Sequence, residues 1–76
     1  MLGDNIRILR HDRNLSRLKL ANLCQLDDAG IYRIESGQSK NPSVHTIDRI
    51  AKILEVSIDD LLHKDFSIEL KRKREN

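Results

Sequence analysis

The side chains best suited to binding chemistry lie between residues 27 and 36, where polar and apolar positions separate onto two faces of a predicted helix. At about 100° per residue, Ile31 and Ile34 share the face that should be buried. The opposite face carries a carboxylate, a methyl group, a phenol, a guanidinium and a hydroxyl, from Asp28, Ala29, Tyr32, Arg33 and Ser36. A helix with one buried face and one chemically rich exposed face is suited to the major groove of DNA, which is wide enough to admit it.

Start and stop signals place this segment among four other predicted helices. Residues with good N-cap chemistry precede the second to fifth helices, and they are Ser16, Asp27, Ser43 and Ser57. Asn14 ends the first helix, and Gly37 ends the third because glycine accepts a left-handed backbone. The strongest helical period runs from Val44 to Leu54. The sequence therefore predicts an all-α fold, a compact bundle of five short helices that contains a helix-turn-helix.

The end of the chain has a different pattern. Phe66, Ile68 and Leu70 alternate as they would in a strand, although they lie in a charged segment. Residues 1–65 carry ten Lys or Arg and ten Asp or Glu, so the net charge of +2 comes from four basic and two acidic residues beyond them. The run from Lys71 to Arg74 is either a solvated tail or a phosphate contact. We therefore divide the chain into a helix-turn-helix domain, 1–65, and a C-terminal extension with a basic tail, 66–76.

Composition excludes several classes of protein. A length of 76 residues, with 38% hydrophobic and 34% charged residues, indicates one globular domain with a modest core. No apolar run approaches the roughly 18 residues of a transmembrane helix and no signal-peptide core follows Met1, so we expect a cytoplasmic protein without membrane contact. Cys24 is the single cysteine and makes no zinc-binding spacing with the histidines, so it is predicted to be a core thiol. No metal, cofactor or enzyme activity is expected, because neither paired carboxylates nor a nucleophile beside a base is present.

Several short stretches of the chain follow one another in a recognisable order. They are Leu15-Ser16, Leu20-Ala21, Leu26, residues 31–37, Asn41-Pro42-Ser43 and residues 50–62. This pattern, which extends over about four-fifths of the chain, resembles the lambda-repressor/Cro-like (XRE) helix-turn-helix DNA-binding family. The resemblance implies a supporting helix over residues 16–24 and a recognition helix over residues 27–36. It also implies a sequence-specific transcriptional regulator, a repressor, that binds double-stranded DNA as a homodimer.

The resemblance assigns roles to individual positions. The base-reading positions are Asp28, Ala29, Tyr32 and Arg33. An arginine can make a bidentate contact with guanine, a carboxylate can accept from cytosine N4, and a methyl side chain can contact the thymine methyl. The positions that follow the DNA backbone are Ser16, Arg17, Ser36, Ser39, Lys40 and Asn41. Arg10 and Glu35 match a structural ion pair of the family and are therefore kept apart from the DNA contacts.

Three reading positions have a plain structural alternative. Arg33 is either a base reader or an ordinary surface arginine. Asp28 either reads a base or stabilises the positive end of its own helix. Tyr32 either contacts DNA or simply covers the helix surface.

Some residues depart from the family pattern. Gln25 stands at the turn where the family usually has glycine, which requires a non-glycine residue to accept a left-handed backbone. Gly30 lies inside the recognition helix and should cost it about 1 kcal/mol relative to alanine, unless a close approach of the backbone to DNA requires the small residue. Ile8, Leu18 and Leu23 are apolar where the helical phase predicts exposure. They are either single exposed aliphatic residues, which are common, or a surface for a protein partner.

The end of the chain holds more apolar groups than a short terminal segment can bury alone. These groups, which we predict to form a dimer interface, are Val56, Ile58, Leu62, Phe66 and Ile68. Two recognition helices related by a dyad read half-sites about 34–36 Å apart, so a dimer predicts a pseudo-palindromic operator. The alternative is that these residues cover the core of the monomer. The rival function is an antitoxin-like or adaptor module of the same fold that binds another protein.

Overall fold

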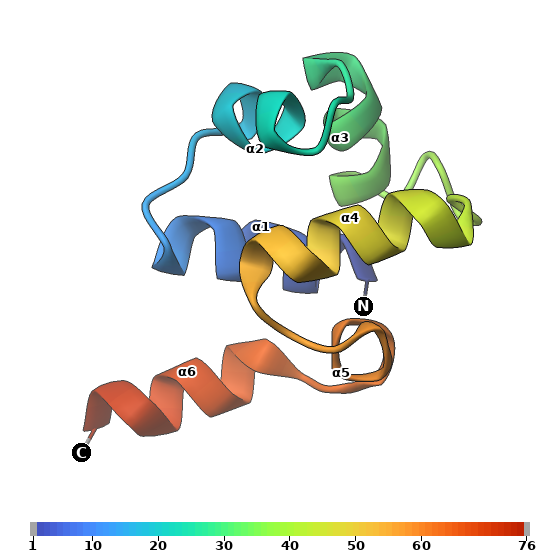
Figure 1. The fold of residues 1–76 in the computed structure, drawn as a ribbon. Helices are drawn as coiled ribbons and strands as arrows, with labels where there is room; N and C mark the ends of the chain where they lie inside the picture. The colour runs from blue at the N-terminus through green and yellow to red at the C-terminus, as the bar shows by residue number, and fades with distance from the viewer. Residues whose placement is uncertain (1, 76) are drawn as a thin grey trace.

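The computed structural model describes residues 2–75, with side chains through residue 73, as six α-helices joined by short turns. The helices are α1 (Leu2–Asp12), α2 (Arg17–Leu23), α3 (Asp28–Glu35), α4 (Val44–Leu54), α5 (Ile58–His63) and α6 (Phe66–Glu75). In Figure 1, α2 and α3 lie together above α1 and α4, while α5 and α6 lie below them. The predicted all-α class is confirmed. None of the described helices is both long and apolar enough to span a membrane.

Side-chain caps explain where the middle helices begin. The Oγ of Ser16 accepts from the backbone N–H of Lys19 at 3.0 Å, and an Asp27 Oδ1 accepts from the N–H of Gly30 at 2.8 Å. Ser43 and Ser57 cap α4 and α5 in the same way. Each cap pairs an N–H that the helix itself leaves without a partner. All four predicted N-caps are confirmed.

The turns that end three helices use left-handed residues that are not glycine. Asn14, Gln25 and Glu55 have φ values of 56°, 59° and 61°. At Gln25 the next N–H, from Leu26, donates to the carbonyl of Ala21 at 2.8 Å, and Gln25 N–H donates to the carbonyl of Asn22 at 3.2 Å. These two bonds close the end of α2 and offset the steric cost of the left-handed backbone. The left-handed geometry predicted at Gln25 is confirmed.

Helix α1 is the centre of the fold, because it contacts α3, α4, α5 and α6. The core around it is aliphatic, with Ile6, Leu9, Leu20, Ile31, Ile50, Leu54 and Leu61 all at most 1% exposed. Cys24 is buried among them, which confirms the predicted core thiol, and burial raises the pKa of that thiol.

Gly3 lies where the start of α1 closely approaches the end of α3. A Cβ at this position would lie 2.5 Å from the carbonyl oxygen of Ile34 and 2.6 Å from that of Glu35. The start of α1 therefore reaches the end of α3 only because residue 3 has no side chain. This contact holds the end of α3 against α1.

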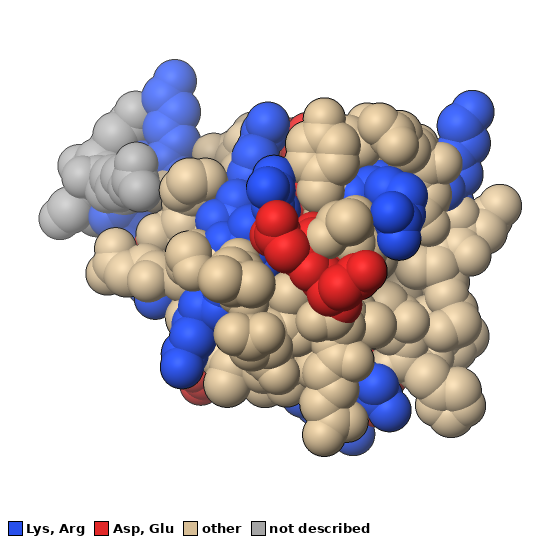
Figure 2. Space-filling model, turned by 90° about the horizontal axis from the view of Figure 1, so that it is seen from above, with Lys and Arg blue, Asp and Glu red and all other residues tan. Residues whose placement is uncertain are grey.

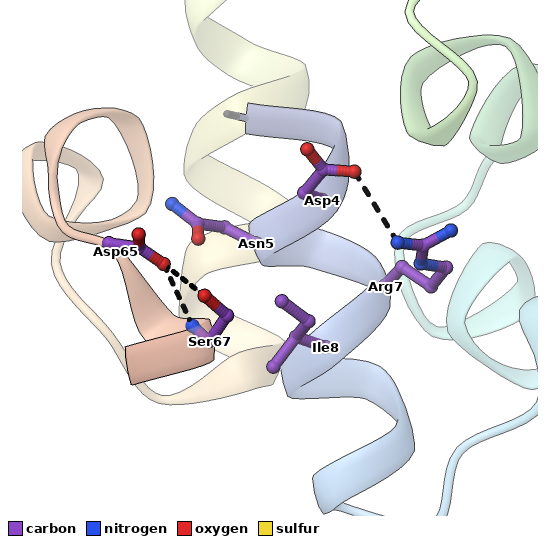
Figure 3. Close-up of a pocket in the computed structure, with 6 residues that line it drawn as sticks. All are labelled: Asp4, Asn5, Arg7, Ile8, Asp65 and Ser67. Carbon is purple, nitrogen blue, oxygen red and sulfur yellow. Dashed lines mark hydrogen bonds and ion pairs between the residues drawn. The ribbon is translucent and has the colours of Figure 1, made fainter. Parts of the chain in front are cut away.

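The segment beyond Lys64 corrects the prediction of five helices, because it forms α6. Phe66 and Leu70 alternate with polar residues, but they are four apart and so also share one face of a helix. The Asn5 amide joins this helix to the core: Nδ2 donates to the carbonyls of Leu61 at 2.9 Å and Lys64 at 2.6 Å, and Oδ1 accepts from the N–H of Phe66 at 3.3 Å. Figure 3 shows Asn5 on α1 pointing toward the segment that joins α5 and α6. Beside it lies a hollow of about 400 Å³, lined by Asp4, Asn5, Arg7, Ile8, Asp65 and Ser67.

Candidate nucleic-acid interface

Helices α2 and α3 pack against each other across the short turn at residues 24–27 and form a helix-turn-helix. On α3, Ile31 and Ile34 are buried at 0% and 5% exposure and hold the helix against the core. The other face points to solvent, because the helix has only one apolar stripe. The geometry therefore places an exposed polar helix at the edge of the molecule, where the ribbon shows α3 (Figure 1).

Three of the four predicted base-reading residues are exposed on this outer face. Ala29, Tyr32 and Arg33 are exposed. Within the described part of the chain, Arg33 forms no ion pair, so its guanidinium is available to a ligand. Asp28, the fourth residue, is different because another side chain already holds its carboxylate.

Arg17 holds Asp28 in a bidentate ion pair. Its Nε donates to Asp28 Oδ1 at 2.7 Å and its Nη2 donates to Oδ2 at 3.1 Å. The hydrogen bond raises the pKa of Arg17 and lowers the pKa of Asp28. The Arg17 guanidinium carbon also lies 5.0 Å from the centre of the Tyr32 ring, within the range of a cation–π contact. Figure 2 shows the α2–α3 side of the molecule, with acidic groups at its centre and basic groups on both sides.

The predicted backbone-contacting residues lie at the start of α2, at the end of α3 and in the loop after α3. Ser16 is exposed but its hydroxyl caps α2, and the Ser36 hydroxyl donates to the carbonyl of Arg33 at 3.3 Å. Lys40 and Asn41 are exposed in the loop after α3, and Ser39 is half-buried. Helix α3 and the loop after it line one hollow of about 240 Å³, whose lining includes Arg33, Ser39, Pro42 and Thr46.

Arg10 and Glu35 form a second bidentate pair, away from the exposed face of α3. The Arg10 Nε donates to Glu35 Oε2 at 2.8 Å and Nη2 donates to Oε1 at 3.1 Å, while Nη1 donates to the carbonyl of Leu15 at 3.0 Å. The side chains are only 10% and 8% exposed. The structure thus brings these two residues together between α1 and α3.

The predicted dimer residues separate into three groups. Phe66 is 5% exposed and lies in the core of its own chain, because α6 turns the ring toward α1; it is not free for a dimer contact. Val56, Ile58 and Leu62 pack partly against the core. Ile68 is 50% exposed, since it lies about 200° around α6 from Phe66.

Exposure of the apolar residues on α1 and α2 differs among the three sites. Leu18 and Leu23 are exposed at 57% and 44%, whereas Ile8 is half-buried against the core.

No three His, Cys, Asp or Glu side chains within the described residues are grouped as a metal site would require.

Comparison with known proteins links this geometry to a family. Residues 1–63 match the family described as helix-turn-helix domain. The chain is 36% identical over 67 residues to the HTH-type transcriptional repressor RghR of Bacillus subtilis (strain 168), a match that covers 88% of this chain and 50% of RghR. The chain thus spans about half the length of that relative.

Two solved structures have the same fold. One is SinR, the master regulator for biofilm formation, in complex with DNA, with a TM-score of 0.78 and 27% identity over 82% of this chain and 98% of that chain. The other is the SinR–SinI protein complex, with a TM-score of 0.80 and 23% identity over 100% of this chain and 80% of that chain. At this identity, the second likeness concerns the fold alone.

Proposed function

The chain belongs to the helix-turn-helix domain family, and from this premise we propose that it is a sequence-specific DNA-binding transcriptional regulator whose helix α3 enters the major groove. The family assignment agrees with the resemblance to lambda-repressor/Cro-like proteins, and it does not place the chain among enzymes. The observation that carries the proposal is α3 itself, with two buried isoleucines on its inner face and solvent-accessible polar side chains on its outer face. That SinR, of similar fold, was solved with DNA supports it.

In this proposal the outer face of α3 reads bases and the residues around it position the helix. Arg33 donates to guanine, Ala29 contacts a thymine methyl, and Tyr32 covers the neighbouring base edge. Backbone contacts come from the surrounding polar residues, namely Ser16, Arg17, Ser36, Ser39, Lys40 and Asn41. RghR is named as a repressor, and we extend repression to this chain by similarity.

We further propose that the regulator acts as a twofold dimer on a pseudo-palindromic operator. The exposed side chain of Ile68 lies on the face of α6 that points away from the core, between Asp65 and Arg72. An antiparallel pairing of two such faces would set Asp65 of one protomer near Arg72 of the other and bury both isoleucines. To bind such an operator, the dimer would have to present its two α3 helices to half-sites about 34–36 Å apart.

Selection of bound sequences from a random pool of duplexes tests DNA recognition. The parent should enrich one motif, and Arg33→Ala should weaken binding to it by about 1–3 kcal/mol and relax one base position. Lys40→Ala should weaken binding to all duplexes alike and reduce the slope of log affinity against log salt concentration by about one unit. Arg7→Ala is the matched control, because Arg7 is an exposed arginine on α1 and not on the outer face of α3. A parent that enriches no sequence would contradict the proposal.

Sedimentation at micromolar concentration tests the dimer. Ile68→Glu should dissociate a dimer into monomers, because it would bury a carboxylate at the centre of the contact. Leu18→Glu is the control, since Leu18 is similarly exposed but lies on α2. A parent that sediments as a monomer would contradict the proposed α6 interface. Dissociation by the Leu18 variant alone would move the contact to α2, the surface that also suits a protein-binding adaptor.

A further inference from the structure

We propose that the Arg17–Asp28 ion pair is a specificity device that keeps affinity for arbitrary DNA low, because Asp28 neutralises the Arg17 guanidinium that would otherwise bind any phosphate. This inference rests on the proposed function and concerns the same surface. Binding to DNA of any sequence comes mostly from cations that displace counterions from phosphates. A cation whose charge is matched by a carboxylate supplies little of that affinity.

Arg17 contacts two residues of α3, Asp28 and Tyr32. Two of its donors, Nε and Nη2, point at the two oxygens of Asp28, and its guanidinium group contacts the Tyr32 ring. Planar bidentate pairs of this kind are the strongest that an arginine makes with a carboxylate. The pair is nevertheless open to solvent, with side chains 40% and 41% exposed. It can therefore open when DNA offers better partners.

The position of the pair gives it a role in discrimination. Arg17 is the first residue of α2 and Asp28 is the first residue of α3, so the pair links the two helices at the proposed DNA surface. When a base offers Asp28 a donor such as cytosine N4–H, the carboxylate gains a new partner and Arg17 is released to a phosphate. On other sequences Asp28 has no such partner, and the pair stays closed. One base contact and one phosphate contact are thereby gained together.

Asp28→Asn is the test, since it removes the charge with little change in shape. It should raise affinity for random duplex about eightfold at 0.1 M salt, because one more phosphate contact adds about 0.9 to the salt slope. The ratio of specific to random binding should fall. With Arg17→Ala in the same chain, the gain on random DNA should disappear.

Asp27→Asn is the matched control. It changes the net charge equally and lies next to Asp28, but Asp27 caps α3, a role that asparagine fills equally well. An equal rise in random binding for both variants would reduce the effect to net charge and overturn the inference. So would a loss on the selected site without any gain on random DNA, which would make Asp28 an independent base reader.

The two proposals fail in different ways. A parent that prefers no duplex overturns the proposed function and the inference together. A parent that selects a motif, combined with an Asp28→Asn variant whose random binding and salt slope match the parent, overturns the inference alone. Far-UV circular dichroism of each variant establishes that the helices are intact before binding is measured.

Discussion

Two arginine–carboxylate pairs in this molecule have nearly the same geometry and very different surroundings. Arg10 meets Glu35 with donor–acceptor distances of 2.8 and 3.1 Å, and Arg17 meets Asp28 at 2.7 and 3.1 Å. The first pair is 10% and 8% exposed and the second is 40% and 41% exposed. Geometry therefore does not distinguish a structural pair from one that can take part in binding. The two pairs differ in how far their side chains are exposed to water.

The free-energy cost of breaking each pair depends on its exposure to water. Removing one partner of a buried pair leaves a charge without hydration, which costs more than the pair itself contributes. In an exposed pair, water replaces the lost partner at once, so opening costs little. The buried pair can thus hold α1 against α3, while the exposed pair remains free to exchange partners.

The largest expected effect is on the buried pair. Glu35→Ala should lower the free energy of unfolding by about 3–5 kcal/mol, because the Arg10 guanidinium loses two of its partners in a site closed to water. Urea denaturation followed by circular dichroism measures this. Where Glu35→Ala is too unstable to purify, Glu35→Gln provides a milder variant.

Asp28→Ala is the control for that measurement, and its unfolding midpoint should fall far less than that of Glu35→Ala, because the pair that it breaks is open to water. DNA affinity of the Glu35 variant should fall only in proportion to its unfolded fraction. A Glu35→Ala protein that melts like the parent but no longer binds DNA would break the comparison and place Glu35 in the interface.

A smaller effect is expected at the same contact between α1 and α3. Gly3→Ala should destabilise the protein by about 1–3 kcal/mol, because its methyl group would meet two backbone carbonyls that cannot move independently. Gly30→Ala is the matched variant. Its methyl group would lie 2.6 Å from Asp27 Oδ1, the end of a side chain that can shift, and alanine favours a helix by about 1 kcal/mol over glycine.

Thermal melts of the two glycine variants measure the difference. Gly30→Ala should melt within a few degrees of the parent while Gly3→Ala melts well below it. Equal melting temperatures would mean that α1 and α3 separate more easily than the contact at Gly3 indicates.

Local signals in the sequence were sufficient to predict much of this fold. N-caps at Ser16, Asp27, Ser43 and Ser57 and the buried stripe of α3 depend on residues only a few positions apart. The left-handed backbone at Gln25 followed from its place in the family pattern. These features were predictable because they depend on spacing along one helix or turn.

Contacts between distant segments were not predictable in the same way. Phe66 and Leu70 fit both a strand and a helix in so short a segment, and the amide of Asn5, about 60 positions away, joins the start of α6 to α1. The closeness of Gly3 to α3 has no local signal. Arg17 and Asp28 were each assigned a DNA contact, and nothing in their spacing indicated that they hold each other.

The smallest expected effect is on the pKa of Asp28 in the exposed pair, and on stability at low pH. Because the hydrogen bond from Arg17 lowers the pKa of Asp28, the pair contributes stability above the ordinary carboxyl pKa of about 3.9 and loses it as the pH falls through the lower value in the folded state. From pH 5 to 8 the pair therefore adds no pH dependence to unfolding. Arg17→Ala should raise the pKa of Asp28 toward its ordinary value, as measured by carboxyl carbon NMR, while Arg33→Ala should leave it unchanged. An Asp28 that titrates identically with and without Arg17 would mean that the two side chains do not pair in solution, and Arg17 would then be free to bind any phosphate.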